Sequence, residues 1–213
     1  MNLRSKMIKS LNRSTLTRYD HQLISDWVEQ DSRVIDLGCG NGKLLKHLQA
    51  SKNVSGYGVE LDPEMISQCI DNDINVIQFN LDKGLGHFDT GSFDTVILSL
   101  TLQAMRRPKE LLEEMMRVGN QGIVTFPNFA HWRNRWQIAM LGKMPESKQL
   151  PHHWFDTPNI HLCTIRDFHA LCQQLGYQIE SSVAVREDGV QSLGLKLFPN
   201  LFGEIALCRF RKP

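Results

Sequence analysis

The chain has 213 residues, a formal net charge of +1 and 41% apolar residues. This length is sufficient for one well-buried domain, and the composition is that of an ordinary globular protein. A near-neutral charge gives no general support for binding to nucleic acid or to an anionic membrane. The sequence shows neither an apolar run approaching the roughly 18 residues of a membrane span nor a signal-peptide hydrophobic region. The five scattered cysteines are typical of reduced thiols, so we expect a cytoplasmic protein.

The first predicted elements come before the first strand. Residues 1–17 combine four basic with several apolar side chains, and we interpret them as a basic N-terminal arm. A short basic amphipathic helix is the alternative for this segment. Apolar residues at helical spacing then predict a helix over residues 19–29 that packs on a sheet. We expect everything from residue 18 to residue 213 to form a single domain.

A glycine-rich turn follows the first predicted strand, residues 34–37, which contains Asp36. Leucines at helical spacing follow the turn and predict a helix. Glycine at alternate positions lets a ligand approach the main chain closely, and the helix that begins there presents free N–H groups. The three glycines of the turn are Gly38, Gly40 and Gly42.

Glu60 lies twenty residues beyond Gly40, at the end of the second predicted strand. A carboxylate there can accept hydrogen bonds from both hydroxyls of a ribose, which predicts a nucleoside ligand. The dinucleotide fingerprint, however, requires Gly or Ala where Lys43 stands. Asp36 is a poor neighbour for a pyrophosphate and a good one for an ammonium group. S-adenosylmethionine (SAM) meets both conditions, and the alternatives are an NAD site or a Rossmann-like domain that has lost its ligand.

The phrases VIDLGCGNG and GVELD resemble the first two motifs of class I SAM-dependent methyltransferases. This resemblance implies an α/β, Rossmann-like fold with a seven-stranded, mostly parallel sheet, an antiparallel last strand and helices on both faces. The alternation of predicted strands and helices also favours α/β with a parallel sheet. We expect residues 188–203 to be a loop or an insertion before the last strand. The later strands are predicted over residues 75–79, 92–100, 122–126, 177–185 and 204–210.

Two helix starts and one helix end have local signals. Asp62 is predicted to cap a helix that has Pro63 at its first position. Thr164 is predicted to cap a later helix with Asp167 at the third position, and Gly176 fits the residue after that helix ends.

In class I methyltransferases an acid just after the third strand commonly contacts the adenine amino group. Asn80 holds that place here; it keeps an acceptor oxygen but brings no charge. Asp82 either substitutes for the missing acid or is a turn residue. We expect SAM or S-adenosylhomocysteine as the cofactor. The expected binding residues are Asp36, Gly38, Gly40, Gly42, Glu60, Asn80, Leu81 and Asp82.

Aromatic and imidazole side chains are concentrated late in the chain, with three of the four tryptophans and four histidines between residues 131 and 161. Ligands of open α/β sheets bind outside the carboxyl ends of the strands, so this segment should begin near the cofactor cleft. We predict an insertion at about residues 127–163 that serves as a lid, a substrate wall or a protein contact surface. Its candidate contact residues are Trp132, Arg133 and Trp154.

The histidines of this segment have several interpretations. The default is that they only satisfy hydrogen bonds, whereas His131 and His161 are the candidates for a general base. A metal site is not predicted, because the residues that could be proposed as ligands lack a zinc spacing. Those residues are His152, His153, His161 and Cys163.

Further phrases narrow the resemblance to one family. Over about residues 18–210 the chain resembles the MetW family, which is tied to methionine biosynthesis. The phrases TLQA, PNFAHWR and DTPNIHLCTI are the most specific, because methyltransferases at large do not share them. The family is methyltransferase-like, and it is associated with the homoserine O-acyltransferase MetX.

The resemblance implies two functions of different class. The first is an accessory protein with a SAM-binding fold that binds and activates or regulates MetX. In its favour, no Asn-Pro-Pro-Tyr-like acceptor motif follows the fourth strand, where Ser99-Leu100-Thr101-Leu102 stands. The alternative is a SAM-dependent methyltransferase with an unidentified small-molecule acceptor, since methyl transfer needs mainly in-line positioning and exclusion of water. Whether the chain is an enzyme is left open, as is a homodimer; no nucleic-acid or membrane partner is expected.

Overall fold

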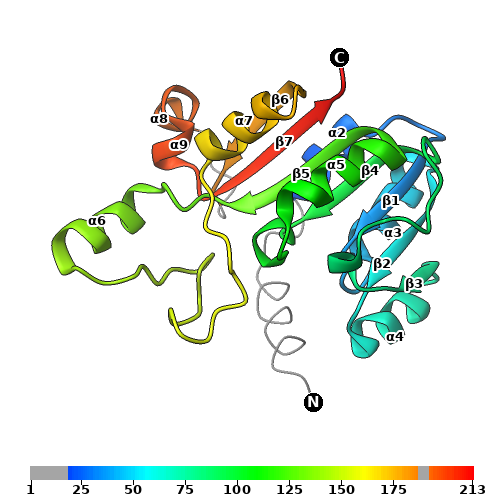
Figure 1. Cartoon of the computed structure of the whole chain (residues 1–213), viewed down its shortest axis with the longest axis horizontal. Coiled ribbons are helices and arrows are strands. Elements are labelled where there is room, and N and C mark those ends of the chain that lie inside the picture. Colours follow the sequence, from blue (N-terminus) through cyan, green and yellow to red (C-terminus); the bar gives the residue numbers. More distant parts are fainter. Residues whose placement is uncertain (1–18, 187–191) are drawn as a thin grey trace.

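The computed structural model describes residues 19–186 and 192–213, so the predicted basic arm at 1–17 lies outside the described residues. The described chain is built on a seven-stranded sheet with the order β3-β2-β1-β4-β5-β7-β6 (Figure 1). Its strands are β1 (Arg33–Leu37), β2 (Ser55–Glu60), β3 (Val76–Gln78), β4 (Phe93–Ser99), β5 (Gly119–Pro127), β6 (Gln178–Val185) and β7 (Ile205–Arg211).

Strand direction follows the expected pattern. β1 to β5 pair in parallel, and β7 runs antiparallel to both of its neighbours, β5 and β6. The central strands are nearly continuous in apolar residues because both of their faces are buried. The predicted sheet, with an antiparallel last strand, is therefore confirmed.

Helices cover both faces of the sheet, which gives the molecule two cores (Figure 1). One core lies under α5 and α7 and contains a cluster of three phenylalanine rings. The other lies under α2, α3 and α4. The phenylalanines are Phe126, Phe168 and Phe210. The helices are α2 (Tyr19–Trp27), α3 (Lys43–Lys52), α4 (Pro63–Asp71), α5 (Pro108–Val118), α6 (Trp132–Leu141), α7 (Ile165–Gln174), α8 (Leu193–Leu197) and α9 (Pro199–Phe202), with 3-10 turns η1 (Leu81–Lys83) and η2 (Leu102–Ala104).

The predicted helix boundaries are confirmed. Asp62 accepts a hydrogen bond from the N–H of Glu64 at the start of α4. Thr164 and Asp167 form a reciprocal capping box at the start of α7, and Gly176 adopts φ +72° just beyond its end.

The described part of the segment before the last strand is helical, which contradicts the loop alternative and not the insertion alternative. Residues 188–203 were expected to be a loop or an insertion, and their described part, 192–203, forms the short helices α8 and α9. Ser192 caps α8 by accepting the N–H of Leu195, and Pro199 starts α9. Two such short helices have too few turns for a helical period to be visible in the sequence. Across the described residues, the helices are too short or too polar to cross a membrane.

Candidate functional site

The glycine turn connects β1 to α3 through three left-handed glycines. Gly38, Gly40 and Gly42 have φ values of +75°, +56° and +75°. Side chains rarely adopt this region of backbone space, so the turn requires glycine. A Cβ at Gly38 would also lie 2.6 Å from Oγ1 of Thr101, which shows that the turn packs directly against the segment after β4.

Glu60 at the end of β2 holds this turn through main-chain hydrogen bonds. One carboxylate oxygen accepts the N–H of Gly40 at 2.9 Å, and the other accepts those of Leu61 and Asp62 at 2.6 and 3.0 Å. Burial raises the pKa of Glu60, and the three N–H groups oppose that shift. A carboxylate offers about four lone-pair positions, so a ligand that binds through two hydroxyls must displace at least one backbone donor.

Asp36 is the second buried carboxyl group beside the turn. It is 1% exposed, and its Oδ1 atom has no hydrogen-bond partner. Burial, and to a lesser degree the charge of Glu60, raises the pKa of Asp36 to about 7. An unpartnered buried oxygen is costly, so a cationic or hydrogen-bond-donating ligand would find an acceptor here.

Two thiols are in contact at the turn. The Sγ atoms of Cys39 and Cys69 are 3.8 Å apart, and Cys69 also donates to the carbonyl oxygen of Gly40 at 3.1 Å. All five cysteines are free thiols, as predicted. Cys69 therefore ties α4 to the turn.

The segment after β3 is held by turn contacts. Asn80 accepts the N–H of Asp82 at 3.1 Å as the cap of η1. Asp82 in turn accepts a hydrogen bond from the backbone N–H of Arg106 at 3.0 Å. Leu81, which lies between Asn80 and Asp82 in the sequence, is buried. The turn interpretation of Asp82 is thus consistent with its contact, and the adenine-binding role of these residues stays a prediction.

The segment at the end of β4 contains a left-handed residue that the sequence did not predict. Leu100 has φ +49°, which is uncommon for a residue with a side chain and concentrates at functional sites. Its carbonyl oxygen accepts Nε2 of the buried Gln103 at 2.7 Å. Nothing in an apolar strand pattern signals a left-handed leucine, so only the structure reveals it.

The two candidate histidines lie in different places. His131 is 8% exposed, precedes α6 and lines a cavity of about 310 Å³. His161 is exposed, lines a smaller cavity of about 90 Å³ and lies 3.4 Å from the carbonyl oxygen of Arg106. The two alternative candidates for a general base therefore line different cavities, and a catalytic role for either one stays a prediction.

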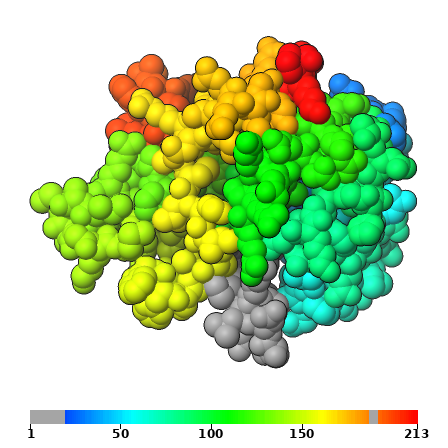
Figure 2. Space-filling view, in the orientation of Figure 1, coloured from blue at the N-terminus to red at the C-terminus, as the bar shows by residue number. Residues whose placement is uncertain are grey.

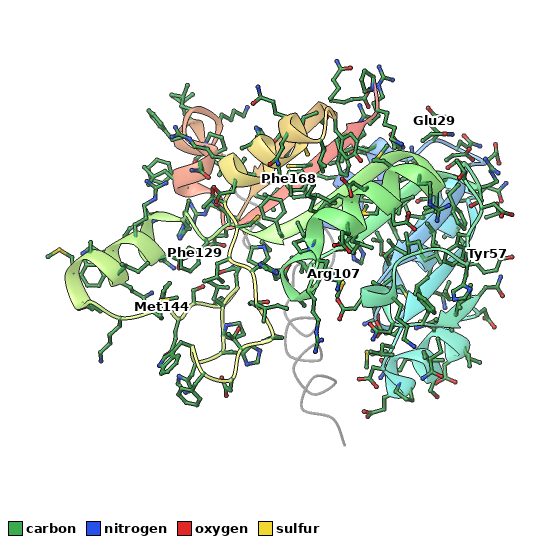
Figure 3. The ribbon with its side chains drawn as sticks, in the orientation of Figure 1. Glu29, Tyr57, Arg107, Phe129, Met144 and Phe168 are labelled. Atoms are coloured by element: carbon green, nitrogen blue, oxygen red, sulfur yellow. The ribbon has the colours of Figure 1, made fainter. Side chains whose placement is uncertain are left out.

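Residues 132–162, here called the aromatic arm, project from the sheet and return to it at α7. α6 forms the first part, with Phe129 at its base and Met144 on the segment that runs back below the helix (Figure 3). The space-filling view shows the arm as a lobe at one side of the molecule (Figure 2). Large apolar side chains stand in solvent along it, and Trp154, at 74%, is the most exposed. The others are Trp132, Trp136, Ile138, Met140, Leu141, Met144, Phe155, Ile160 and Leu162.

Within residues 19–186 and 192–213, no three His, Cys, Asp or Glu side chains are grouped in a way that could hold a metal ion.

Solved structures define the class of fold. The chain superposes on a SAM-dependent methyltransferase from Thermotoga maritima with a TM-score of 0.67, 13% identity and coverage of 99% of this chain and 98% of the other. It matches an S-adenosylmethionine-dependent methyltransferase from Mesorhizobium loti with a TM-score of 0.67, 17% identity and coverage of 95% and 100%. The fold is that of class I SAM-dependent methyltransferases.

Sequence comparison identifies the family. The family model described as "Methionine biosynthesis protein MetW" matches residues 18–210, so the chain belongs to the MetW family. A relative from Rhodopirellula baltica is 35% identical over 202 residues, which are 91% of this chain and 32% of the relative. That relative is the "Bifunctional methionine biosynthesis protein MetXA/MetW", and this chain spans about a third of its length.

Proposed function

We propose that this chain is an accessory protein of methionine biosynthesis that binds homoserine O-acyltransferase (MetX) and activates or regulates it. The observation that carries the proposal is the relative in which MetXA and MetW are joined in one bifunctional protein. The MetW-like part covers only 32% of that relative, so most of its length is a second, covalently attached part. A permanent tether raises the effective concentration of one part for the other, and it is consistent with association between separate chains.

The aromatic arm supplies a surface suited to such a partner. A monomeric protein rarely exposes a large contiguous apolar patch, and aromatic and Met side chains are enriched in interfaces. The arm carries four Lys or Arg residues and two Asp or Glu residues. Two copies meeting through this lobe would bring like charges together, whereas a partner surface with an acidic rim would complement it. Trp132, Arg133 and Trp154 are the contact residues predicted from the sequence.

The glycine turn fits SAM or S-adenosylhomocysteine. Asp36 offers an unpartnered carboxylate oxygen to the cationic end, and Glu60 offers its remaining acceptor capacity to a ribose hydroxyl. Gly38, Gly40 and Gly42 permit close approach of the ligand to the main chain. When bound, SAM would supply an activated methyl group. In the accessory role the same turn would sense SAM as an end product of the pathway.

The test is the activity of homoserine O-acyltransferase from the same source, measured with and without the purified chain. We expect a large rise in activity on addition and co-purification of the two proteins. Titration with SAM should then alter the activated rate. No change in activity together with no complex would contradict the accessory role.

A methyltransferase with an unidentified small-molecule acceptor is the second candidate. It is favoured by the fold and by the buried carboxyl group of Asp36, which lies beside the turn. Methyl-labelled SAM incubated with a cell extract should then yield a labelled product. The product should vanish with Gly40→Arg, because a side chain at φ +56° distorts the turn. Absence of any label with the wild-type chain would argue against methyl transfer in that extract.

A further inference from the structure

The cavity beside His131 lies away from the glycine turn, where the base of α6 meets the end of β6, the start of β7 and the two short helices. Its volume is about 310 Å³, which lies within the range of small-molecule sites. Figure 2 shows that α6 and the α8–α9 segment adjoin on this side of the molecule. The cavity is lined by His131, Trp132, Arg133, Arg186, Ser192, Gly194, Phe202 and Glu204.

The positive groups of this cavity come from two different elements. Arg133 lies in the first turn of α6, and Arg186 follows the end of β6. α6 has ten residues and no side-chain cap, so its first backbone N–H groups also face outward at this end. Guanidinium groups and a helix N-terminus together form an environment that binds a carboxylate.

His131 provides the second, independent sign of a ligand. Its side chain lines the cavity and the residue is only 8% exposed. In the described parts of the chain its ring contacts Trp132 but receives no hydrogen bond. Its ring nitrogens, one a donor and one an acceptor in the neutral form, are therefore available to a ligand in the cavity.

Glu204 adds a negative charge to the same cavity. Its carboxylate accepts a hydrogen bond from Nε2 of Gln149 at 3.1 Å. Burial lowers the pKa of His131; the charge of Glu204 raises that pKa, and the charges of Arg133 and Arg186 lower it. A cavity that carries both signs of charge complements a ligand that carries both. We propose that this cavity is a binding site for a small zwitterionic α-amino acid, with its carboxylate toward Arg133 and Arg186 and its ammonium toward Glu204.

The proposed site is separate from the glycine turn. Three strand spacings, about 14 Å, separate β1, which precedes the turn, from β7, which follows Glu204. An amino acid can therefore bind here while a nucleoside ligand occupies the turn. The site requires neither the acyltransferase partner nor methyl transfer, so it stands or falls independently of the proposed function.

The experiment is calorimetry on the purified full chain with L-homoserine and L-methionine at millimolar concentration, in excess S-adenosylhomocysteine. For homoserine, two analogues remove one charge each: 4-hydroxybutyrate lacks the amino group, and 3-aminopropan-1-ol lacks the carboxylate. We expect at least one of the two amino acids to bind. Both analogues should bind at least about tenfold more weakly than homoserine, because each lacks one charged hydrogen-bonding group.

Variants locate the site. Arg133→Gln and Arg186→Gln should each weaken amino-acid binding about tenfold, whereas Arg166→Gln, on the exposed side of α7, should leave it unchanged. Glu204→Gln should remove the preference for homoserine over 4-hydroxybutyrate. Its backbone hydrogen bonds to Val185 and Asn128 are retained, and urea unfolding checks that each variant is folded.

Three outcomes would overturn the proposal. The first is the absence of binding by both amino acids. The second is binding that Arg133→Gln and Arg186→Gln leave unchanged, which would place the ligand elsewhere. The third is equal binding of homoserine and 4-hydroxybutyrate by the wild-type chain, which would make the cavity a plain anion site.

Discussion

The glycine turn and the aromatic arm are built in opposite ways. At the turn, carboxylates, thiols and main chain are closely packed. A single added Cβ at Gly38 would lie 2.6 Å from Oγ1 of Thr101, which is too close for the turn to accommodate. On the arm, large apolar side chains lie in solvent and few described contacts tie them to the sheet. Substitutions at the turn should therefore change the free energy of unfolding, whereas substitutions on the arm should change only what the chain binds.

The largest effect on folding is expected beside the turn, at Gly56 in β2. A Cβ there would meet the carbonyl oxygen of Val34 in the paired strand, which cannot move without breaking the sheet. Gly56→Ala should cost about 4 kcal/mol of unfolding free energy or more, measured by urea unfolding. Gly86→Ala is the matched control, because nothing lies within 4 Å of its Cβ position. Equal stability of the two variants would contradict this account.

The next effect concerns Asp36 and depends on pH. Its pKa is about 7 in the folded chain and near 3.8 when unfolded, so between these values only the unfolded state loses the proton. The carboxyl group therefore destabilises the fold progressively as pH rises from about 4 to about 7, and by a constant amount above that. Relative to wild type, Asp36→Asn should gain stability across this window, reaching a few kcal/mol. Urea unfolding at several pH values checks it; a difference that does not vary with pH would show that Asp36 titrates normally.

Glu60 tests binding at the turn, as the proposed ribose acceptor. Glu60→Ala should weaken S-adenosylhomocysteine binding by about 1–3 kcal/mol and also destabilise the turn, because three N–H groups lose their acceptor. Glu60→Gln keeps one acceptor oxygen and should fall between Ala and wild type in both properties. Calorimetry and urea unfolding separate the two effects. Full binding by Glu60→Ala would place the ribose elsewhere.

The smallest effect on folding is expected on the arm. Trp154→Ser should change the free energy of unfolding by less than about 0.5 kcal/mol, because the residue is 74% exposed. Trp136→Ser should cost somewhat more, about 1 kcal/mol, because about half of Trp136 is buried. Binding to the acyltransferase should nevertheless weaken by about 2 kcal/mol if these residues are central to the contact. Surface binding assays with the two purified proteins measure this. Unchanged affinity in both variants would remove the arm from the proposed interface.

The same contrast explains what could be read from the sequence. Elements with a strong period or a local cap, such as α7 after Thr164, were predicted because neighbouring residues determine them. The turn was predicted because only glycine tolerates its backbone. Leu100 and the three backbone donors on Glu60 were not, because they depend on contacts between segments distant in the chain. The cavity beside His131 also escaped prediction, since three separate segments enclose it.

The position of β7 has a consequence for the order of folding. This strand is the last one in sequence, yet it lies inside the sheet and supplies hydrogen bonds to β5 on one side and to β6 on the other. During synthesis β6 therefore has no place in the sheet until β7 has emerged, although β1 to β5 can already pair. Folding should proceed in two stages, with a partly formed, parallel sheet that exposes the edge of β5. The final stage inserts one strand between two others, and it completes both the Phe126–Phe168–Phe210 cluster and the wall that carries Glu204.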